Sequence, residues 1–200
     1  GTYNVLLSAQ DLVSCSSLTF GCNGGLSQAV FYELEKYGIV PDECLPYTSG
    51  STGKGGSCPK NVTCFGREWT DLKQLRFKVK SYSHTGKYFE KTSSRAEAIQ
   101  RELVQNGPVD ALFNVYADFS SYSSGVYRHV TGGFKGIHAV RVIGYGVDNA
   151  SGLPYWLVAN SWGTRWGDKG YFKILRGEDT CGIELMVYAG MPDIANAPRL

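Results

Sequence analysis

The chain has 200 residues, of which 42% are hydrophobic and 19% charged, so it can bury a sizeable core and is not disordered by composition. This length predicts one domain or two small lobes that share an interface. The formal net charge of +2 gives no reason to expect nucleic acid or an anionic membrane as a partner. No apolar run approaches the roughly 18 residues that span a bilayer, and we expect any targeting segment to lie outside these residues.

The cysteines favour disulfide bonds over a metal site. Six cysteines allow fifteen full pairings, and no two of them form a C-x-x-C pair, which argues against zinc. We therefore expect no metal and an oxidising compartment. The sequons Asn61-Val-Thr63 and Asn149-Ala-Ser151 are compatible with secretory passage. The six residues are Cys15, Cys22, Cys44, Cys58, Cys64 and Cys181.

The first predicted elements are two helices separated by a glycine-rich turn. Ser8 and Asp11 match a capping box, with Asp11 reaching back to the helix start, and predict a short helix that runs into Cys15. The turn is Gly21-Cys-Asn-Gly-Gly25. Apolar residues recur at helical spacing through 26–37, and Gly38 fits the position that ends this second helix.

The middle of the chain reads as a loop and a third helix. Residues 41–76 are loop-like, with a Gly/Ser-rich centre at 48–57. His84 follows a strand-like stretch at 79–83 and is interpreted as a surface residue. Ser94 and Glu97 repeat the capping-box pattern and predict a helix through about Gln105, ended by Asn106-Gly-Pro108.

From Val109 onward, short apolar runs punctuated by glycine predict strands. Their regular spacing indicates an antiparallel, β-barrel-like lobe, and the chain as a whole is expected to be α+β. We place the division after residue 76, with a helical part in 1–76 and a β-rich part in 77–200. The predicted strands are 109–116, 125–130, 138–147, 155–160, 170–175 and 185–189.

Two of these strands carry a residue that a plain core strand would not choose. His138 opens one and Asn160 closes the next. A neutral imidazole acts as a general base when its other nitrogen is held, and an Asn side-chain oxygen can hold it without adding charge. Trp162 could cover the pair and keep water away. Alone, a strand histidine is more often a core or surface residue, and a strand-end Asn or a double glycine is more often part of a turn.

These stretches together resemble the papain-like cysteine proteases, and most closely the cathepsin B group. The resemblance covers nearly the whole chain and implies a two-lobe papain-like fold, with His138 as the catalytic base, Asn160 orienting it, and Trp162 shielding their hydrogen bond. The matching stretches are Gly21–Gly25, Ser124–Gly132, Gly136–Gly146, Pro154–Gly163, Trp166-Gly-Asp168, Phe172–Gly177 and Cys181-Gly-Ile-Glu184.

The nucleophile that such an enzyme needs does not stand in a matching motif. The family signature Cys-Gly-Ser/Ala-Cys-Trp/Tyr is absent, and it should lie roughly 130 residues or more before His138, near or before the first residue. The resemblance also implies bonds Cys15–Cys58 and Cys44–Cys64, with Cys181 a buried free thiol and Cys22 left over as a possible interchain cysteine. We therefore expect a heavy-chain-like portion whose partner is a light chain, or an N-terminal segment, that carries the catalytic cysteine.

The resemblance also indicates how a substrate is chosen. Gly24 and Gly25 would let an extended peptide lie against the backbone. Cathepsin B has a glutamate where Met186 stands, so hydrophobic P2 side chains are expected here in place of arginine. The thirteen residues between Cys44 and Cys58 include no histidine, unlike the longer occluding loop of cathepsin B, and this predicts an endopeptidase. The expected S2 walls are Leu112, Ile137, Ala139 and Met186, with Ser27 at the rim; each of the four walls could also be ordinary core.

The leading hypothesis is therefore a cysteine endopeptidase acting on peptides and proteins, without a metal or organic cofactor. Cystatin-like inhibitors are plausible partners, and a lysosome, a lysosome-like vacuole or the secretory pathway is the expected location. The alternative is a nonenzymatic cathepsin-like glycoprotein that binds peptide or matrix. A truncated form of the enzyme would differ from the leading hypothesis only in where the missing segment went.

Overall fold

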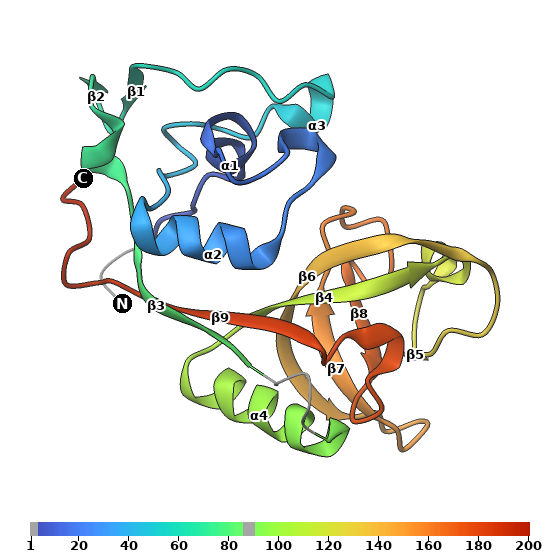
Figure 1. Ribbon diagram of the computed structural model, residues 1–200. Helices are drawn as coiled ribbons and strands as arrows, with labels where there is room; N and C mark the ends of the chain where they lie inside the picture. The colour runs from blue at the N-terminus through green and yellow to red at the C-terminus, as the bar shows by residue number, and fades with distance from the viewer. Residues whose placement is uncertain (1–3, 86–90) are drawn as a thin grey trace. The chain divides into compact units, whose positions relative to one another are not determined.

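The computed structural model describes residues 4–85 and 91–200, and the chain separates into two compact units. Unit 1 holds the chain up to Tyr82 together with Gly190–Leu200, and unit 2 holds Ser83–Ala189. The change of unit thus falls six residues after the division expected at 76, and the C-terminal residues belong with the N-terminal ones. Unit 1 holds mostly short helices, and unit 2 holds most of the strands together with the helix Thr92–Gln105, so the expected α+β class is confirmed (Figure 1).

Unit 1 is built from short elements. The stretch 41–76, expected to be loop, contains four of them, so that expectation was wrong in part. The elements are α1 (Ala9–Cys15), η1 (Gly21–Asn23), α2 (Ser27–Lys36), α3 (Ser49–Thr52), the hairpin β1 (Val62–Cys64) and β2 (Arg67–Trp69), and η2 (Leu72–Leu75).

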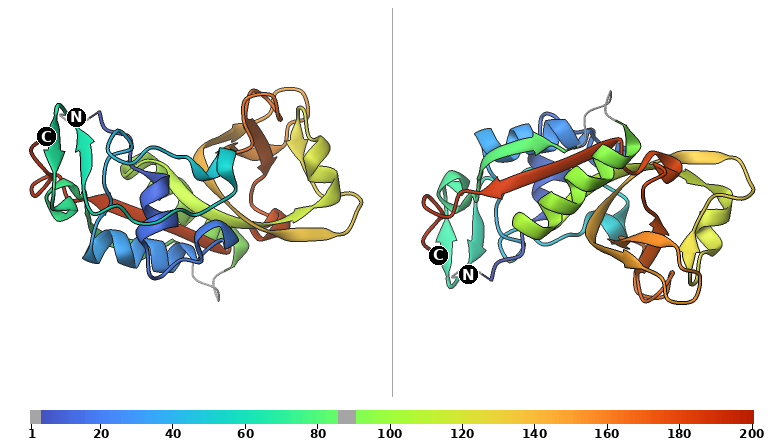
Figure 2. Two further views of the ribbon diagram at one scale, coloured as in Figure 1. Left: turned by 90° about the horizontal axis from the view of Figure 1, so that it is seen from above. Right: turned by 90° about the horizontal axis from the view of Figure 1, so that it is seen from below.

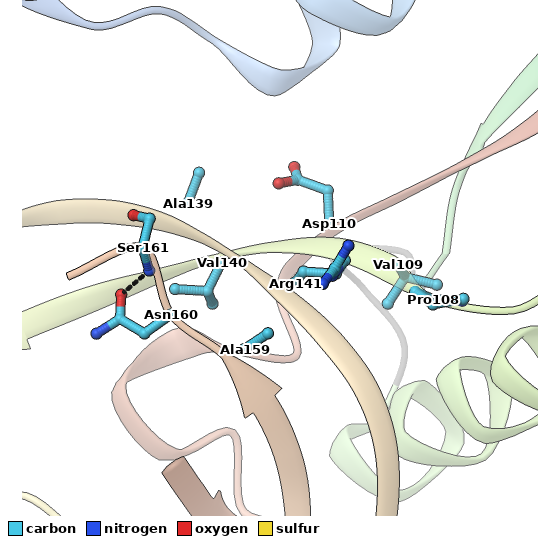
Figure 3. A pocket seen from close by; sticks show the side chains of 9 residues that line it. All are labelled: Pro108, Val109, Asp110, Ala139, Val140, Arg141, Ala159, Asn160 and Ser161. Carbon is cyan, nitrogen blue, oxygen red and sulfur yellow. Dashed lines mark hydrogen bonds between the residues drawn. The ribbon is translucent and has the colours of Figure 1, made fainter. Parts of the chain in front are cut away.

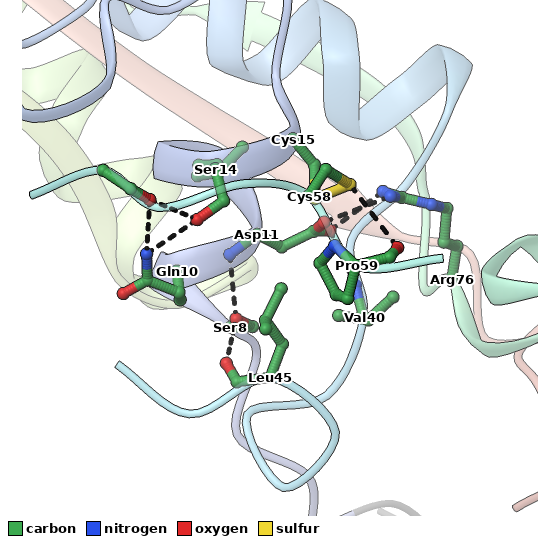
Figure 4. The surroundings of a disulfide bond; sticks show 12 residues. Ser8, Gln10, Asp11, Ser14, Cys15, Val40, Leu45, Cys58, Pro59 and Arg76 are labelled. Carbon is green, nitrogen blue, oxygen red and sulfur yellow. Dashed lines mark hydrogen bonds and ion pairs between the residues drawn. A yellow bond between two sulfur atoms is a disulfide. The ribbon is translucent and has the colours of Figure 1, made fainter. Parts of the chain in front are cut away.

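The start of α1 follows the predicted cap only in part. The Ser8 hydroxyl accepts the Asp11 backbone N–H at 2.9 Å, which confirms Ser8 as the N-cap. The Asp11 carboxylate does not reach back. It accepts the Val40 N–H at 3.1 Å and both terminal nitrogens of Arg76 at 2.9 and 3.1 Å (Figure 4). A buried carboxylate is better satisfied by a guanidinium than by one more amide, so this long-range pair takes the place of the local one.

The end of α2 is as expected. Tyr37 caps the helix and Gly38 follows it with φ +79°. A Cβ at Gly38 would meet the Phe77 carbonyl oxygen at 2.7 Å, so both the backbone conformation and the space require glycine.

Two disulfides lie in unit 1, Cys15–Cys58 and Cys44–Cys64, in the pairing that the resemblance implied. They close loops of 43 and 20 residues, each worth about 3–4 kcal/mol through the entropy of the unfolded chain. Cys44 and Cys64 also belong to the small buried core of this unit, with Val40, Val62, Trp69 and Leu75.

Most of unit 2 is a twisted sheet. The strands of the sheet run in the order β3-β9-β4-β6-β7-β8-β5, and the chain passes between the units within β3 and β9. Their bounds are β3 (Val79–His84), β4 (Val109–Tyr116), β5 (Val126–Tyr127), β6 (Phe134–Val147), β7 (Pro154–Ala159), β8 (Tyr171–Leu175) and β9 (Met186–Pro192).

The barrel-like description of this sheet was wrong, whereas its antiparallel character is confirmed for most of the strand pairs. The sheet is open, because β3 and β5 are its two edges and do not pair with each other in the described residues. In addition, β5 pairs with β8 in parallel. The pairs β9–β4, β4–β6, β6–β7 and β7–β8 are antiparallel.

Helix α4 (Thr92–Gln105) packs against β4 and β6 and covers one face of the sheet (Figure 2). Its N-cap is Lys91, so the predicted capping box at Ser94 and Glu97 was wrong, and both residues lie inside the helix. Ala96 and Ile99 of α4 join the core beneath it. The alternate residues of β4 that face this core are buried, which is the period of two expected for a half-buried strand. Two 3₁₀ helices, η3 (Ala117–Ser121) and η4 (Thr180–Gly182), complete unit 2.

Candidate active site in the second unit

Two antiparallel neighbours, β6 and β7, bring His138 and Asn160 together. Arg141 of β6 pairs with Ala159 of β7, so His138 and Asn160 lie at the same end of this strand pair. The distance from Nε2 of His138 to Oδ1 of Asn160 is 2.9 Å. The backbone N–H of Asn160 donates to the Gly170 carbonyl at 2.9 Å, which holds the end of β7 in place.

The hydrogen bonds of Asn160 define the protonation of the imidazole. Oδ1 of Asn160 also accepts the Ser161 backbone N–H at 2.8 Å, so it is the oxygen, not the amide nitrogen, that faces His138. An oxygen acceptor requires Nε2 of His138 to carry a hydrogen. In a neutral ring the other nitrogen, Nδ1, then has the free lone pair that a general base needs.

Aromatic rings surround this pair. The Trp162 indole is stacked on the His138 ring, with 5.4 Å between centroids and 20° between planes. Trp162 in turn meets Phe119 and Trp166 edge-on at 5.4 and 5.1 Å, and Phe113 lies beneath His138 at 6.1 Å. The indole is 42% exposed, so it covers the imidazole on one side and meets solvent on the other.

Three of the four expected S2 wall residues are in register across neighbouring strands. Leu112 of β4 lies opposite Ala139 of β6 on one side and Met186 of β9 on the other. Directly opposite residues of antiparallel strands share a face, and so do residues two apart, which adds Ile137 to that face. Figure 3 shows Ala139 projecting to one side of the sheet and Val140 to the other. Ile137 is 61% exposed, so the reading of it as core was wrong.

A pocket of about 460 Å³ lies beside this face and reaches the site. It is lined by the start of β4, by β6 just after His138, and by Ala159 at the end of β7 with Asn160 and Ser161 just after it (Figure 3).

The remaining expected site residues, Gly24, Gly25 and Ser27, lie in unit 1. Gly24 follows η1 with φ +99°, a conformation that favours glycine, and a Cβ there would meet no atom within 4 Å. Both glycines are exposed, and Ser27 is the first residue of α2. The backbone at Gly24 and Gly25 is therefore open to an approaching chain.

Unit 2 does not supply a nucleophilic thiol from either of the two free cysteines, Cys181 and Cys22. Cys181 is packed against the core, and its burial raises the pKa of the thiol to about 11, so the thiolate is scarce at neutral or acidic pH. Cys22 is exposed and lies in η1 of unit 1. Among residues 4–85 and 91–200, no three His, Cys, Asp or Glu side chains are grouped so as to hold a metal ion.

One buried carboxylate of unit 2, just before β9, was given no role in the site on the basis of the sequence. Glu184 is fully buried, and its Oε1 accepts the Trp156 indole N–H at 2.8 Å and the Gly177 N–H at 2.6 Å. Burial raises the pKa of this carboxyl group. Because Glu184 precedes Met186 by two residues, its bonds fix the chain at the start of β9. The signal in the sequence was an acidic residue in an otherwise apolar stretch.

No helix within the described ranges is long and apolar enough to cross a membrane.

In sequence, residues 1–191 match the family model of the papain family cysteine proteases. Among curated proteins, "Cathepsin B-like cysteine proteinase 5" of Caenorhabditis elegans is 38% identical over 98% of this chain and 62% of its own length. "Cathepsin B-like protease 1" of Arabidopsis thaliana is 41% identical over 96% of this chain and 51% of its own length. Among solved structures, proCathepsin B S9 from Trypanosoma congolense superposes with a TM-score of 0.79 at 37% identity, covering 94% of this chain and 61% of that one. The chain thus spans about half to three fifths of the length of these relatives.

Proposed function

The chain belongs to the papain family of cysteine proteases, and on that premise we propose that it supplies the base, orienting and specificity residues of a cysteine endopeptidase of the cathepsin B group. The observation that carries the proposal is the 2.9 Å hydrogen bond between His138 and Asn160 beneath the Trp162 indole. It leaves Nδ1 of His138 as the nitrogen that exchanges protons during the reaction.

The proposed reaction is acyl transfer. A thiolate attacks the peptide carbonyl, and the protonated Nδ1 of His138 gives its proton to the leaving amine. His138 then takes a proton from water, which hydrolyses the thioester and regenerates the thiolate. Asn160 holds the ring through both steps because its oxygen accepts from Nε2 whether the ring is neutral or protonated. Trp162 limits the access of water to that hydrogen bond.

We place the thiolate outside residues 1–200, on an N-terminal segment or a separate light chain. This is supported by the absence of the family's nucleophile motif from the sequence and by the burial of Cys181. The same segment would supply the oxyanion-hole donors, for which no matching motif is present here. Cys22 is the cysteine that we propose pairs with that segment, since the other four cysteines of unit 1 are already bonded to one another.

The proposed preference is for hydrophobic P2 side chains. Leu112, Ala139 and Met186 share one face in register and are apolar, so an arginine placed against them would lose water without gaining a partner charge. Ile137 lies on the same face, and Ser27 of unit 1 is proposed as a further substrate-binding residue. Gly24 and Gly25 are proposed to hold the substrate backbone in extended form.

Met186→Glu is expected to reverse this preference. A carboxylate at that position would pair with a P2 arginine, so the ratio of kcat/KM for a P2 Arg peptide to that for a P2 Phe peptide should rise by about tenfold or more, which corresponds to about 1.4 kcal/mol. Two fluorogenic peptides that differ only at P2 measure this. Met191→Glu is the matched control. Met191 lies on β9 like Met186, but in the part of the strand that belongs to unit 1, where it is 42% exposed. An unchanged ratio in Met186→Glu would remove Met186 from the pocket.

The endopeptidase assignment is tested with internally quenched peptides whose C-terminus is free or amidated. We expect equal cleavage of the two, because the segment 44–58 carries no histidine to bind a C-terminal carboxylate. Dipeptide release that depends on the free carboxylate would contradict it.

The two disulfides support an oxidising compartment, lysosome-like or secreted, and cystatin-like inhibitors are proposed partners. The relatives named above are proteases by description and give no support to the nonenzymatic alternative.

A further inference from the structure

Unit 1 has a pocket of about 420 Å³ that the proposed peptidase chemistry does not use. It lies between the C-terminal end of α2 and the segment formed by η2 and the residues that follow it, next to the Cys15–Cys58 disulfide. Its volume is within the range of small-molecule sites. The lining residues are Cys15, Ser17, Glu33, Lys36, Tyr37, Lys73, Arg76 and Lys78.

The charge of this lining is strongly one-sided. Four cationic side chains stand against one carboxylate, a surplus of three, whereas the whole chain has a net charge of +2. The charge of Arg76 is balanced by its partner Asp11, which does not line the pocket, and three lysines and one acidic residue then remain in the lining. That acid, Glu33, is buried and accepts a hydrogen bond from the Ser16 hydroxyl. None of the three lysines forms an ion pair with any residue of the described ranges.

The cations are held in place but keep unused donors. Lys78 Nζ donates to the Lys36 carbonyl at 2.8 Å, and Lys36 Nζ donates to the Tyr32 hydroxyl at 3.0 Å. An ammonium group has three hydrogens, so Lys78 retains two. Lys36 also interacts with Tyr37 and lies over the rings of Tyr32 and Tyr37, at 5.4 and 5.3 Å, which leaves it one. Lys73 makes no side-chain bond in the described part of the chain. Arg76 uses three of its five N–H groups: two donate to Asp11 (Figure 4), and one donates to the Gly38 carbonyl.

We propose that this pocket binds a tetrahedral oxyanion, namely a sulfate or phosphate group. Several lysines and a guanidinium anchored by Asp11 match the multiple acceptor oxygens of such a group better than the two of a carboxylate. The Ser17 and Tyr37 hydroxyls in the lining add neutral donors. The site requires neither His138 nor a bound segment, so it stands or falls independently of the proposed peptidase.

The test is a titration of the full protein with inorganic sulfate and with inorganic phosphate. Binding is measured by calorimetry and by the NMR chemical shifts of the backbone amides. We expect saturable binding that shifts amides at 36–37 and 73–78 and that weakens in about 1 M NaCl, where the screening length falls to about 3 Å. Lys73→Gln and Lys78→Gln should each weaken binding by about twofold to fivefold, the equivalent of one partly exposed ion pair, and the double variant by about tenfold.

Lys54→Gln is the matched control, because Lys54 is exposed in the same unit outside the pocket, and its affinity should equal that of the parent. Glucose 6-sulfate and glucose 6-phosphate, with glucose as the neutral control, distinguish the source of the anion. Tighter binding of the esters identifies a group on a larger ligand, and equal binding identifies a free ion. Absence of saturable binding, or an equal loss in Lys54→Gln and Lys73→Gln, would overturn the proposal.

Discussion

Replacing His138 with glutamine is expected to lower kcat for peptide hydrolysis by about 10³-fold, within the range typical of losing a general acid–base group. Glutamine can still donate to Oδ1 of Asn160, so β6 should keep its geometry at this position, but no nitrogen remains that can accept a proton. The loss should therefore appear in kcat, with KM changed little, because the pocket residues stay in place.

His129→Gln is the control for this substitution. Nδ1 of His129 lies 3.1 Å from the Asp118 carboxylate, and glutamine retains a donor for that contact. We expect its kcat to remain near that of the parent. The thermal midpoints of both variants establish that folding is unchanged. A His138→Gln enzyme with near-parental kcat would remove this residue from the chemistry.

Trp156→Ala is expected to destabilise the protein by about 3–5 kcal/mol, the usual cost of emptying a large buried aromatic site. Trp156 is 1% exposed, and its indole N–H donates to the buried Glu184 carboxylate at 2.8 Å. The substitution therefore creates a cavity and also removes a donor from a carboxylate that water does not reach. Denaturant unfolding measures the loss, and Trp156→Phe isolates the hydrogen bond by retaining most of the packing.

Trp162→Ala removes the same side chain from a site that is 42% exposed, and it should cost less than about 1 kcal/mol. It should nevertheless reduce kcat, because the His138 ring loses its stacking partner. If the two alanine variants were equally unstable, burial of Trp156 would not be what anchors unit 2.

The strands of unit 2 could be read from the sequence because each carries a local pattern. Val109–Tyr116 was predicted with the bounds of β4, since alternate residues face the core. The order of the strands could not be read in the same way. Nothing in the local pattern of 126–127 indicates a parallel pairing with β8, and the open edges at β3 and β5 follow from long-range pairing alone.

Local capping patterns were less reliable than strand periodicity. The box at Ser94 and Glu97 has the right spacing, yet α4 begins three residues earlier than that box predicts, after Lys91. At Ser8 the cap formed, but its partner Asp11 was taken by Arg76, 65 residues away. A local sequence pattern cannot predict such a long-range ion pair, because the distant residue comes close only when the chain folds.

Within the candidate site, the resemblance identified single residues and the fold supplied their relations. The bond from His138 to Asn160 and the register of Leu112 with Ala139 and Met186 are properties of strand pairing. The lysine-rich pocket of unit 1 had no sequence signal, because Lys36 lies far along the chain from Lys73 and Lys78.

The most direct test of the central claim, that this chain supplies the base for a thiolate lying outside its 200 residues, is covalent trapping. The full protein is treated with an epoxide peptide that has leucine at P2, and the adduct is located by intact mass and peptide mapping. We predict one adduct on a cysteine outside residues 1–200, none on Cys22 or Cys181, and strongly slowed labelling in His138→Gln. An adduct on Cys22 or Cys181, or a folded protein that takes up no epoxide at all, would contradict the account.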